Sequence, residues 1–262
     1  MVNKTKRVVV LSDLQIPYQH DKTVEATLEF IQDYKPDELW CVGDELDAPE
    51  PSRWNKGMSG EYAETLQESI DLTHDIMARY RSALGNKPFY IQRSNHTDRI
   101  DTYMRKYAPA FMSLKSLEIE ELLGYSKLKI NYLHKMHELL PGWVMAHGDE
   151  GALNRAPGAT ALNLAKRLGK SVVCGHTHRI GLQHETTGFY GKTSTLYGLE
   201  VGHMMDIKQA SYLTSGAANW QHGIGILVEH NRKVTPFAVP IPAVTVEVKL
   251  KGFPKIFLKF LK

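Results

Sequence analysis

Short apolar runs of strand length recur along the chain, and helical patterns separate several of them. Five such runs are rich in β-branched or aromatic residues, namely residues 8–11, 39–42, 89–92, 143–146 and 171–174. Runs of this length and composition are typical of buried strands. Strands that alternate with helices along a chain predict an α/β fold with parallel pairing.

The segment 21–38 has apolar residues at helical spacing. Val24, Leu28 and Ile31 recur every three or four residues, and Pro36 ends the pattern. A strand, this helix and the next strand form a βαβ unit, for which a right-handed crossover is expected.

Further helices are expected at about 61–84 and, in shorter pieces, over residues 98–140, which we interpret as a cap-like insertion. After residue 205 the chain alternates between apolar and polar residues, as in "GIGILVEH" and "AVTVEVKL". This alternation predicts a second sheet made largely of consecutive strands. We therefore expect a single domain over residues 1–250, followed by a basic and hydrophobic tail at 251–262.

The composition is ordinary for a globular protein: 262 residues, 42% of them hydrophobic and 23% charged, with a formal net charge of +3. The charge is unevenly spread, because residues 249–262 carry five lysines and no acidic residue. The rest of the chain is mildly acidic, which argues against a general nucleic-acid-binding surface. The tail could bind a membrane surface or a partner subunit, or form a terminal helix that packs on its own domain.

Other features point to the cytoplasm. No segment approaches the ~20 apolar residues of a membrane span, and the apolar run near the N-terminus is too short for a signal peptide. Cys41 and Cys174 lie in predicted buried strands, which indicates reduced core thiols rather than a disulfide framework. We expect a cytoplasmic protein without a transmembrane segment, and an oligomer is compatible with the sequence.

Residue types that bind metals or move protons directly follow each of the five strands. In chain order these segments read "DLQ", "GDELD", "SNH", "HGD" and "GHTH". The carboxyl ends of strands line the ligand crevice in open α/β sheets, so the five segments should converge. Their oxygen and nitrogen donors, without a thiolate, suit Mn, Fe, Zn or Ni. Their number favours two ions that share a bridging carboxylate.

The order and spacing of these segments resemble the calcineurin-like metallophosphoesterase superfamily, whose pattern is D-x-H, G-D-x-x-D, G-N-H-[DE], a lone His after a strand, and G-H-x-H. The resemblance covers residues 13–178. It implies a four-layer α/β/β/α sandwich of two mixed sheets, with the site at the strand ends. The alternating segment after residue 205 would supply much of the second sheet.

The resemblance also implies roles for individual residues. The expected metal ligands are Asp13, Gln15, Asp44, Asn95, His147, His176 and His178. Asp44 would bridge two divalent ions, with Mn favoured and Fe, Zn or Ni as alternatives. His96 would protonate the leaving oxygen or stabilise the pentacoordinate phosphorane, and Asp47 would orient it. The implied reaction is in-line attack of a metal-bridging hydroxide on a phosphoester.

The sequence departs from the family pattern most clearly at Gln15, which stands where a histidine ligand is usual. A glutamine carbonyl is a weaker and harder ligand than imidazole, so the first site should hold its ion less tightly and favour Mn²⁺ over Zn²⁺. Alternatively, Gln15 only hydrogen-bonds nearby groups, or His20 approaches the gap. In "SNHT", Ser94 replaces the usual Gly, and Thr97 removes a common carboxylate. No arginine follows "GDELD" as in the Ser/Thr protein phosphatases, which argues against that branch.

The substrate is less well determined by sequence than the metal site. A leaving-group acid favours diesters with poor leaving groups, so a small phosphodiester, such as a cyclic nucleotide, is the expected substrate. Arg99, Arg105 and Lys106 could meet phosphate oxygens, with Arg99 as the main candidate, or could form a solvated helix face. A nuclease similar to the family's repair exonucleases is an alternative. A non-catalytic binding module is another, although the presence of His96 argues against it.

Overall fold

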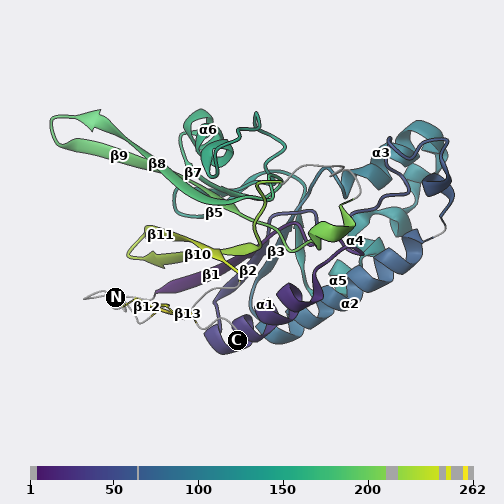
Figure 1. Cartoon of the computed structure of the whole chain (residues 1–262), viewed down its shortest axis with the longest axis horizontal. Coiled ribbons are helices and arrows are strands. Elements are labelled where there is room, and N and C mark those ends of the chain that lie inside the picture. Colours follow the sequence, from purple (N-terminus) through teal and green to yellow (C-terminus); the bar gives the residue numbers. More distant parts are fainter. Residues whose placement is uncertain (1–4, 64, 211–217, 242–245, 249–255, 259–262) are drawn as a thin grey trace.

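The computed structural model describes residues 5–63, 65–210, 218–241, 246–248 and 256–258. Two mixed β-sheets pack face to face, and helices cover the outer face of each sheet (Figure 1). The predicted four-layer α/β/β/α sandwich is therefore confirmed. In the described ranges, no helix is both long and apolar enough to cross a bilayer.

The first sheet has the strand order β11-β10-β1-β2-β3-β4. Its strands are β1 (Lys6–Leu11), β2 (Glu38–Cys41), β3 (Phe89–Gln92), β4 (Asn131–Leu133), β10 (Gly223–His230) and β11 (Lys233–Pro240). The strands β1 to β4 run parallel, whereas β10 pairs antiparallel with both β1 and β11. The carboxyl ends of β1, β2 and β3 therefore lie side by side.

The second sheet has the strand order β5-β6-β7-β9-β8. Its strands are β5 (His137–Leu140), β6 (Trp143–Met145), β7 (Ser171–Cys174), β8 (Ile180–Phe189) and β9 (Lys192–Val201). The strands β6, β7 and β9 run parallel, and β5 and β8 pair antiparallel at the two edges.

The prediction that the segment after residue 205 supplies much of the second sheet is wrong. That segment contributes β10 and β11 to the first sheet, and the second sheet comes from the preceding part of the chain. The reason is the register of β10, which places Ile226 opposite Val9 of β1. The first six residues of β10 are buried, so the strand lies within the core of the sandwich rather than at an outer edge.

Helices of different lengths cover the two sheets. Their bounds are α1 (Asp21–Tyr34), α2 (Leu66–Leu84), α3 (Asp98–Tyr107), α4 (Ile119–Leu122), α5 (Tyr125–Leu128) and α6 (Ala159–Leu168). Short 3₁₀ helices are η1 (Ser59–Tyr62), η2 (Pro109–Ser113), η3 (Lys115–Leu117) and η4 (Ile207–Gln209). In Figure 1, α1, α2 and α5 lie below the first sheet and α6 lies above the second.

The hydrophobic core explains why β1 reads as an uninterrupted apolar run. Val9 and Leu11 pack in the layer between the first sheet and its helices, whereas Val8 and Val10 pack between the sheets. Both faces of the strand are buried, so no polar position is needed on either side. On α1, the predicted apolar positions, such as Leu28, are buried as expected.

Two predicted segments differ in detail from what is observed. The helical part of the 98–140 insertion ends at α5, because β4 and β5 at its end belong to the two sheets. In the tail, β13 (Ile256–Leu258) is a strand that pairs antiparallel with β12 (Val246–Val248), so this part is not helical. The rest of the 251–262 tail lies outside the described residues.

Candidate metal centre

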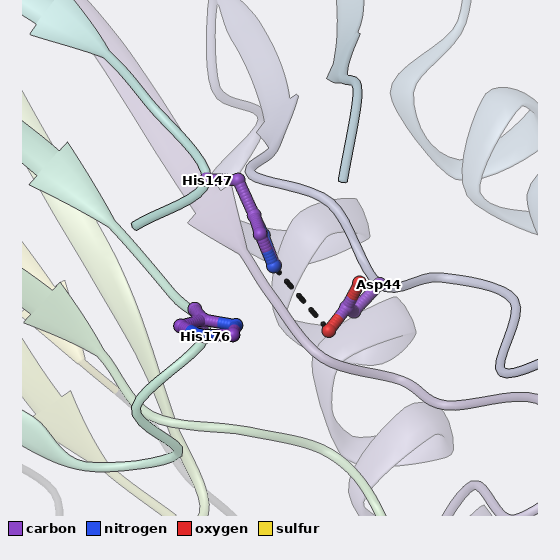
Figure 2. A group of neighbouring side chains, drawn as sticks. All are labelled: Asp44, His147 and His176. Atoms are coloured by element: carbon purple, nitrogen blue, oxygen red, sulfur yellow. Dashed lines mark ion pairs between the residues drawn. The ribbon is translucent and has the colours of Figure 1, made fainter. Parts of the chain in front are cut away.

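The five strand-end segments meet at one end of the sandwich. Three of them follow β1, β2 and β3 of the first sheet, and two follow β6 and β7 of the second. Asp44, His147 and His176 come from both sheets, and their ligand atoms lie within 4.8 Å of one another. Figure 2 shows Asp44 and His147 pointing toward each other, with His176 beside them. The sandwich thus brings together donors that are more than 130 positions apart in sequence.

Each ring nitrogen of His147 has a polar neighbour within hydrogen-bonding distance. Its Nδ1 atom lies 2.8 Å from the carbonyl oxygen of Val42, and a carbonyl can only accept, so Nδ1 carries a proton. Its Nε2 atom lies 2.8 Å from Asn95 Oδ1 and 3.4 Å from Asp44 Oδ2. A backbone partner on one nitrogen orients the other toward a ligand, as in known metal sites.

Asp13 and His178 form a second pair of donors. Asp13 Oδ1 lies 3.0 Å from His178 Nε2, and yet this buried oxygen makes no hydrogen bond within the described part of the chain. Its other oxygen, Oδ2, accepts from the Ser12 hydroxyl and from the backbone N–H of His176, the latter at 2.9 Å. An orphaned buried carboxylate oxygen beside an imidazole nitrogen fits a cation ligand, because such oxygens are otherwise satisfied.

Gln15 lies inside this cluster and is almost fully buried. Its side-chain Nε2 donates to Asp44 Oδ2 at 3.1 Å, and its backbone N–H donates to the Asp44 carbonyl at 2.9 Å. The amide therefore contacts the expected bridging carboxylate. His20, the alternative residue for this position, instead contacts Thr23 Oγ1 at 2.8 Å, and its ring is tilted against that of His222 with centroids 4.8 Å apart.

His96, Asp47 and Arg99 form a connected group beside the ligands. His96 Nδ1 lies 2.8 Å from Asp47 Oδ1, and its Nε2 lies 3.8 Å from Asp44 Oδ2. Arg99 Nη2 lies 2.9 Å from His96 Nε2, and Arg99 Nη1 donates to the Asp47 carbonyl at 2.6 Å. The structure thus places His96 between the carboxylates of Asp47 and Asp44.

The backbone of the centre is unusual. Asp13, Gln15, Asp44, His176 and His178 all have positive φ angles, between 51° and 63°. Non-glycine residues rarely adopt this conformation, and such residues concentrate at functional sites. Tight loops after the strands turn the side chains inward, which a regular continuation of the strands would not do.

Two glycines allow these loops to approach each other. Gly43 has a φ of 101°, and a Cβ there would lie 2.8 Å from His147 Nδ1. A Cβ on Gly175 would overlap the side chain of Ser12. Each motif therefore needs its glycine for space within the centre, independently of ligand chemistry.

The buried acids and histidines perturb one another strongly. Burial raises the pKa of Asp44, but the neighbouring His147 and His96 outweigh it and hold the pKa well below its usual range. Burial lowers the pKa of His147, but Asp44 and Asp13 outweigh it and raise the pKa to about 10. The cluster stabilises positive charge at its centre, which a divalent cation would supply in place of a proton.

Sequence reasoning missed His203 and Trp220. His203 is fully buried, stacks on His178 with ring centroids 5.2 Å apart, and accepts from the backbone N–H of Met205 through Nδ1. Trp220 also packs on His178, with centroids 4.3 Å apart. His203 lies two residues after the end of β9, so the rule that polar residues at strand ends form sites could have found it.

Two curated proteins are similar to almost the whole chain. No family model matches the chain. The Gene 54 protein of Mycobacterium phage D29 is 36% identical over 240 residues, which cover 90% of this chain and 94% of the phage protein. The Gene 54 protein of Mycobacterium phage L5 is 34% identical over 240 residues, with the same coverage. The chain belongs to the family of these Gene 54 proteins.

Several solved structures with much lower sequence identity align with most of the chain. Vacuolar Protein Sorting 29 from Cryptosporidium parvum is 14% identical, covers 90% of this chain and 98% of its own, and has a TM-score of 0.43. The nuclease MPE from Pseudomonas putida is 15% identical, covers 88% and 87%, and has a TM-score of 0.33. A predicted phosphoesterase from Streptococcus pneumoniae TIGR4 is 13% identical, covers 97% and 99%, and has a TM-score of 0.38.

The fold is that of the calcineurin-like metallophosphoesterases, as the motifs predict. Two features of the molecule itself carry this assignment. The two mixed sheets form the α/β/β/α sandwich, and all five motif segments meet at one end of it with potential ligand atoms of both sheets in one group.

Proposed function

We propose that the protein is a metal-dependent phosphodiesterase. The observation that carries this proposal is the position of His96, which lies beside the expected ligands and has its Nδ1 2.8 Å from Asp47 Oδ1. A binding module would need the ligands but not a proton donor oriented beside them. Donor chemistry and the orphaned Asp13 oxygen support the occupancy of the centre by divalent cations.

The residues expected to hold the ions divide into two sets around Asp44. Asp13 and His178 would hold the first ion, with Gln15 next to it, and Asn95, His147 and His176 would hold the second. Bound divalent ions would lower the pKa of a water molecule and neutralise the charge of the phosphoryl oxygens. The mixed oxygen and nitrogen donors fit Mn²⁺ best, with Fe, Zn and Ni as alternatives.

His96 would deliver a proton to the leaving oxygen. Burial lowers the pKa of His96, but the carboxylates of Asp44 and Asp47 outweigh it and raise the pKa above its ordinary value. A raised pKa favours the protonated imidazole, which is the form that a general acid needs. Such an acid matters most for an alkoxide leaving group, as in a natural phosphodiester.

The experiment that tests this function starts from protein stripped of metal by a chelator. Hydrolysis of bis(p-nitrophenyl) phosphate and of p-nitrophenyl phosphate is followed after addition of Mn²⁺, Fe²⁺, Ni²⁺ or Zn²⁺. We expect turnover of the diester with Mn²⁺, and its loss when chelator is restored. Asp44→Asn should abolish it.

A matched control is available in the same loops. Asp149 lies close to the centre, but its carboxylate pairs with Arg93 Nη1 at 2.9 Å. Asp149→Asn should therefore retain turnover. If none of the four ions supports hydrolysis, the protein is a non-catalytic binding module and the proposal is wrong.

A further inference from the structure

A cleft of about 480 Å³ opens beside the candidate metal centre, and most of its lining residues have no role in binding the expected metal ions. It is lined by Pro51, Ser52, Arg53, Trp54, Lys56, Asn95, Arg99, Thr102, Tyr103, Lys106 and Tyr107. The lining residues come from three parts of the chain: the loop after β2, the loop after β3, and α3. Most of its polar side chains are cationic and its apolar lining is largely aromatic.

The cleft is continuous with the reaction centre through two residues. Asn95 lines the cleft, and its Oδ1 lies 2.8 Å from His147 Nε2. Arg99 also lines the cleft, and its Nη2 lies 2.9 Å from His96 Nε2. A ligand that fills the cleft would therefore reach both a metal ligand and the expected proton donor.

The positive charge of the cleft is only partly neutralised. Lys56 Nζ pairs with Glu61 at 2.6 Å and lies 3.9 Å from the ring centroid of Tyr107. Among the described residues, no carboxylate lies within ion-pair distance of Arg53 or Lys106. These two cations are available to phosphate groups. Arg99, at the inner end, is partly neutralised, because its Nη1 lies 3.6 Å from Asp47 Oδ2.

The aromatic residues of the cleft are unusually exposed. Trp54 is 72% exposed, with the guanidinium of Arg53 4.6 Å from its ring centroid. Tyr107 is 44% exposed, and the amines of Lys56 and Lys106 lie 3.9 Å and 5.2 Å from its ring centroid. Exposed aromatic faces interleaved with cations are the pattern by which proteins bind unpaired bases and their phosphates.

We infer that this cleft binds single-stranded nucleic acid and guides one phosphodiester of the strand to His96. Bases stack on Trp54 and Tyr107, and phosphates contact Arg53, Lys106 and Arg99. Cleavage of the bound strand rests on the proposed phosphodiesterase function, whereas binding does not. A duplex is disfavoured, because its bases are already stacked and cannot reach Trp54.

This substrate class differs from the one that the charge of the chain favours. A mildly acidic body argues against general binding of nucleic acid, but the average conceals one local basic and aromatic surface. Hydrolysis of a cyclic nucleotide at the centre would not require Trp54 or Lys106, so this substrate leaves their arrangement unexplained. A strand longer than one nucleotide explains both the centre and the cleft.

Binding is measured first, without catalysis, in the presence of chelator. Fluorescence anisotropy of labelled 12-nucleotide single strands, one DNA and one RNA, gives the affinity, and the same DNA annealed to its complement gives the comparison. We expect tighter binding of the single strands, weakened about 5- to 100-fold by Trp54→Ala, because stacking of a base on an aromatic ring contributes that much. Trp54→Phe, which keeps an aromatic ring for stacking, should retain most of the binding affinity.

The charge contribution is measured as salt dependence. For each phosphate contact removed, as in Arg53→Ala or Lys106→Ala, the slope of log K against log salt should fall by about 0.7. Controls lie on the β8–β9 hairpin, whose tip is at the opposite end of the molecule from α3 (Figure 1). Tyr190, 90% exposed, and Lys192 match the aromatic and the cation, and Tyr190→Ala and Lys192→Ala should leave binding unchanged.

The outcomes separate this inference from the proposed function. With Mn²⁺ present, Trp54→Ala should lower kcat/KM for the oligonucleotide relative to that for the small aryl diester. Binding that the cleft variants weaken, without hydrolysis of any diester, supports the cleft and overturns the phosphodiesterase. Hydrolysis of the aryl diester by a protein that binds no single strand, or binds it equally well as Trp54→Ala, overturns the cleft and leaves the phosphodiesterase standing.

Discussion

The side-chain amide nitrogen of Gln15 lies 3.1 Å from Asp44 Oδ2, at the position where the family pattern D-x-H places an imidazole. The amide nitrogen and oxygen of a glutamine are distinguished only by their hydrogen bonds. A half-turn of the amide would direct the carbonyl oxygen toward the same region as a ligand. Gln15 is therefore placed either to coordinate the first ion or to fix the orientation of the Asp44 carboxylate.

Substitution of Gln15 separates these two roles. If the carbonyl coordinates, Gln15→Ala should weaken one of two metal sites by about 10- to 100-fold, the usual effect of a change near a metal. Gln15→His should tighten the same site and shift its preference toward Zn²⁺ and Ni²⁺, which favour nitrogen ligands. Titration calorimetry with Mn²⁺ and Zn²⁺ measures both changes. Two ions bound with unchanged affinity in both variants would show that Gln15 is not a ligand.

The fold was largely predictable from short-range pattern. Continuous apolar runs mark the strands β1, β3 and β7, and helical spacing of apolar residues marks α1. Both patterns arise from burial, which affects both faces of these strands and one face of the helix. The membership of β10 was not predictable. Its alternating sequence indicates a strand, but only its register with β1, including the pairing of Val9 with Ile226, decides which sheet it joins.

The orientation of His96 by Asp47 predicts a specific pH effect. The nearby carboxylates raise the pKa of His96 despite its burial. Asp47→Asn removes one of them and should lower that pKa. Because a general acid acts only while protonated, the alkaline limb of the kcat profile should shift to lower pH. Steady-state hydrolysis of the aryl diester over a pH series measures the shift.

Removal of the imidazole itself should be more severe. His96→Ala should reduce turnover about 10²- to 10⁴-fold, the usual contribution of a general acid. Metal content, measured by elemental analysis, should remain that of the parent, because we expect His96 to lie beside the metal ligands without being one of them. Loss of metal together with activity would assign His96 to the ligand set instead.

Glu45 predicts a dependence of stability on pH. It is fully buried, and burial raises its pKa from 4.5 to about 7, although the Tyr125 hydroxyl donates to Oε1 at 2.6 Å. The folded state therefore binds the proton more tightly than the unfolded state. The contribution of this proton to the stability of the folded state is therefore fully present below pH 4.5 and is lost as the pH rises toward 7.

Glu45→Gln should isolate this effect in protein kept free of metal by chelator. The variant retains shape but carries no charge, so its free energy of unfolding should exceed that of the parent by about 3 kcal/mol above pH 7, since one pKa unit corresponds to about 1.4 kcal/mol. The difference should shrink through pH 7 to 4.5 and vanish below. Urea denaturation at a series of pH values measures it, and a constant difference would contradict the assignment.

The centre was more predictable than the cleft for a physical reason. Expected metal ligands such as Asp44 and His147 follow strands directly, so the sheet topology alone brings them together. The cleft depends on the path of a long loop and of α3, and nothing in the local pattern around Trp54 indicates that it lines the same cleft as Lys106. Arg99 and Lys106 were candidates for phosphate contact by their charge alone, whereas Arg53 and Trp54 were missed.

The pairing of Lys56 with Glu61 gives the last prediction, which concerns the charge of the cleft. The carboxylate of Glu61 contacts Lys56 Nζ at 2.6 Å and the Tyr103 hydroxyl at 2.7 Å, and these contacts lower its pKa to about 2, chiefly through Lys56. At neutral pH this carboxylate is ionised, cancels the positive charge of Lys56 and weakens the attraction of the cleft for phosphate.

Glu61→Gln should therefore tighten binding of a single-stranded oligonucleotide, whereas most substitutions in a binding cleft weaken it. The slope of log K against log salt should rise by about 0.7, because Lys56 becomes one further contact for a single strand. The glutamine can still accept from the backbone N–H of Gly57, which donates to Glu61 Oε2 at 2.6 Å, so the loop keeps that support. Glu185→Gln removes an exposed carboxylate that pairs with Lys166 on the β8–β9 side of the molecule and serves as the control. Equal gains in both variants would reflect net charge alone, and a gain confined to Glu61→Gln places the strand in the cleft.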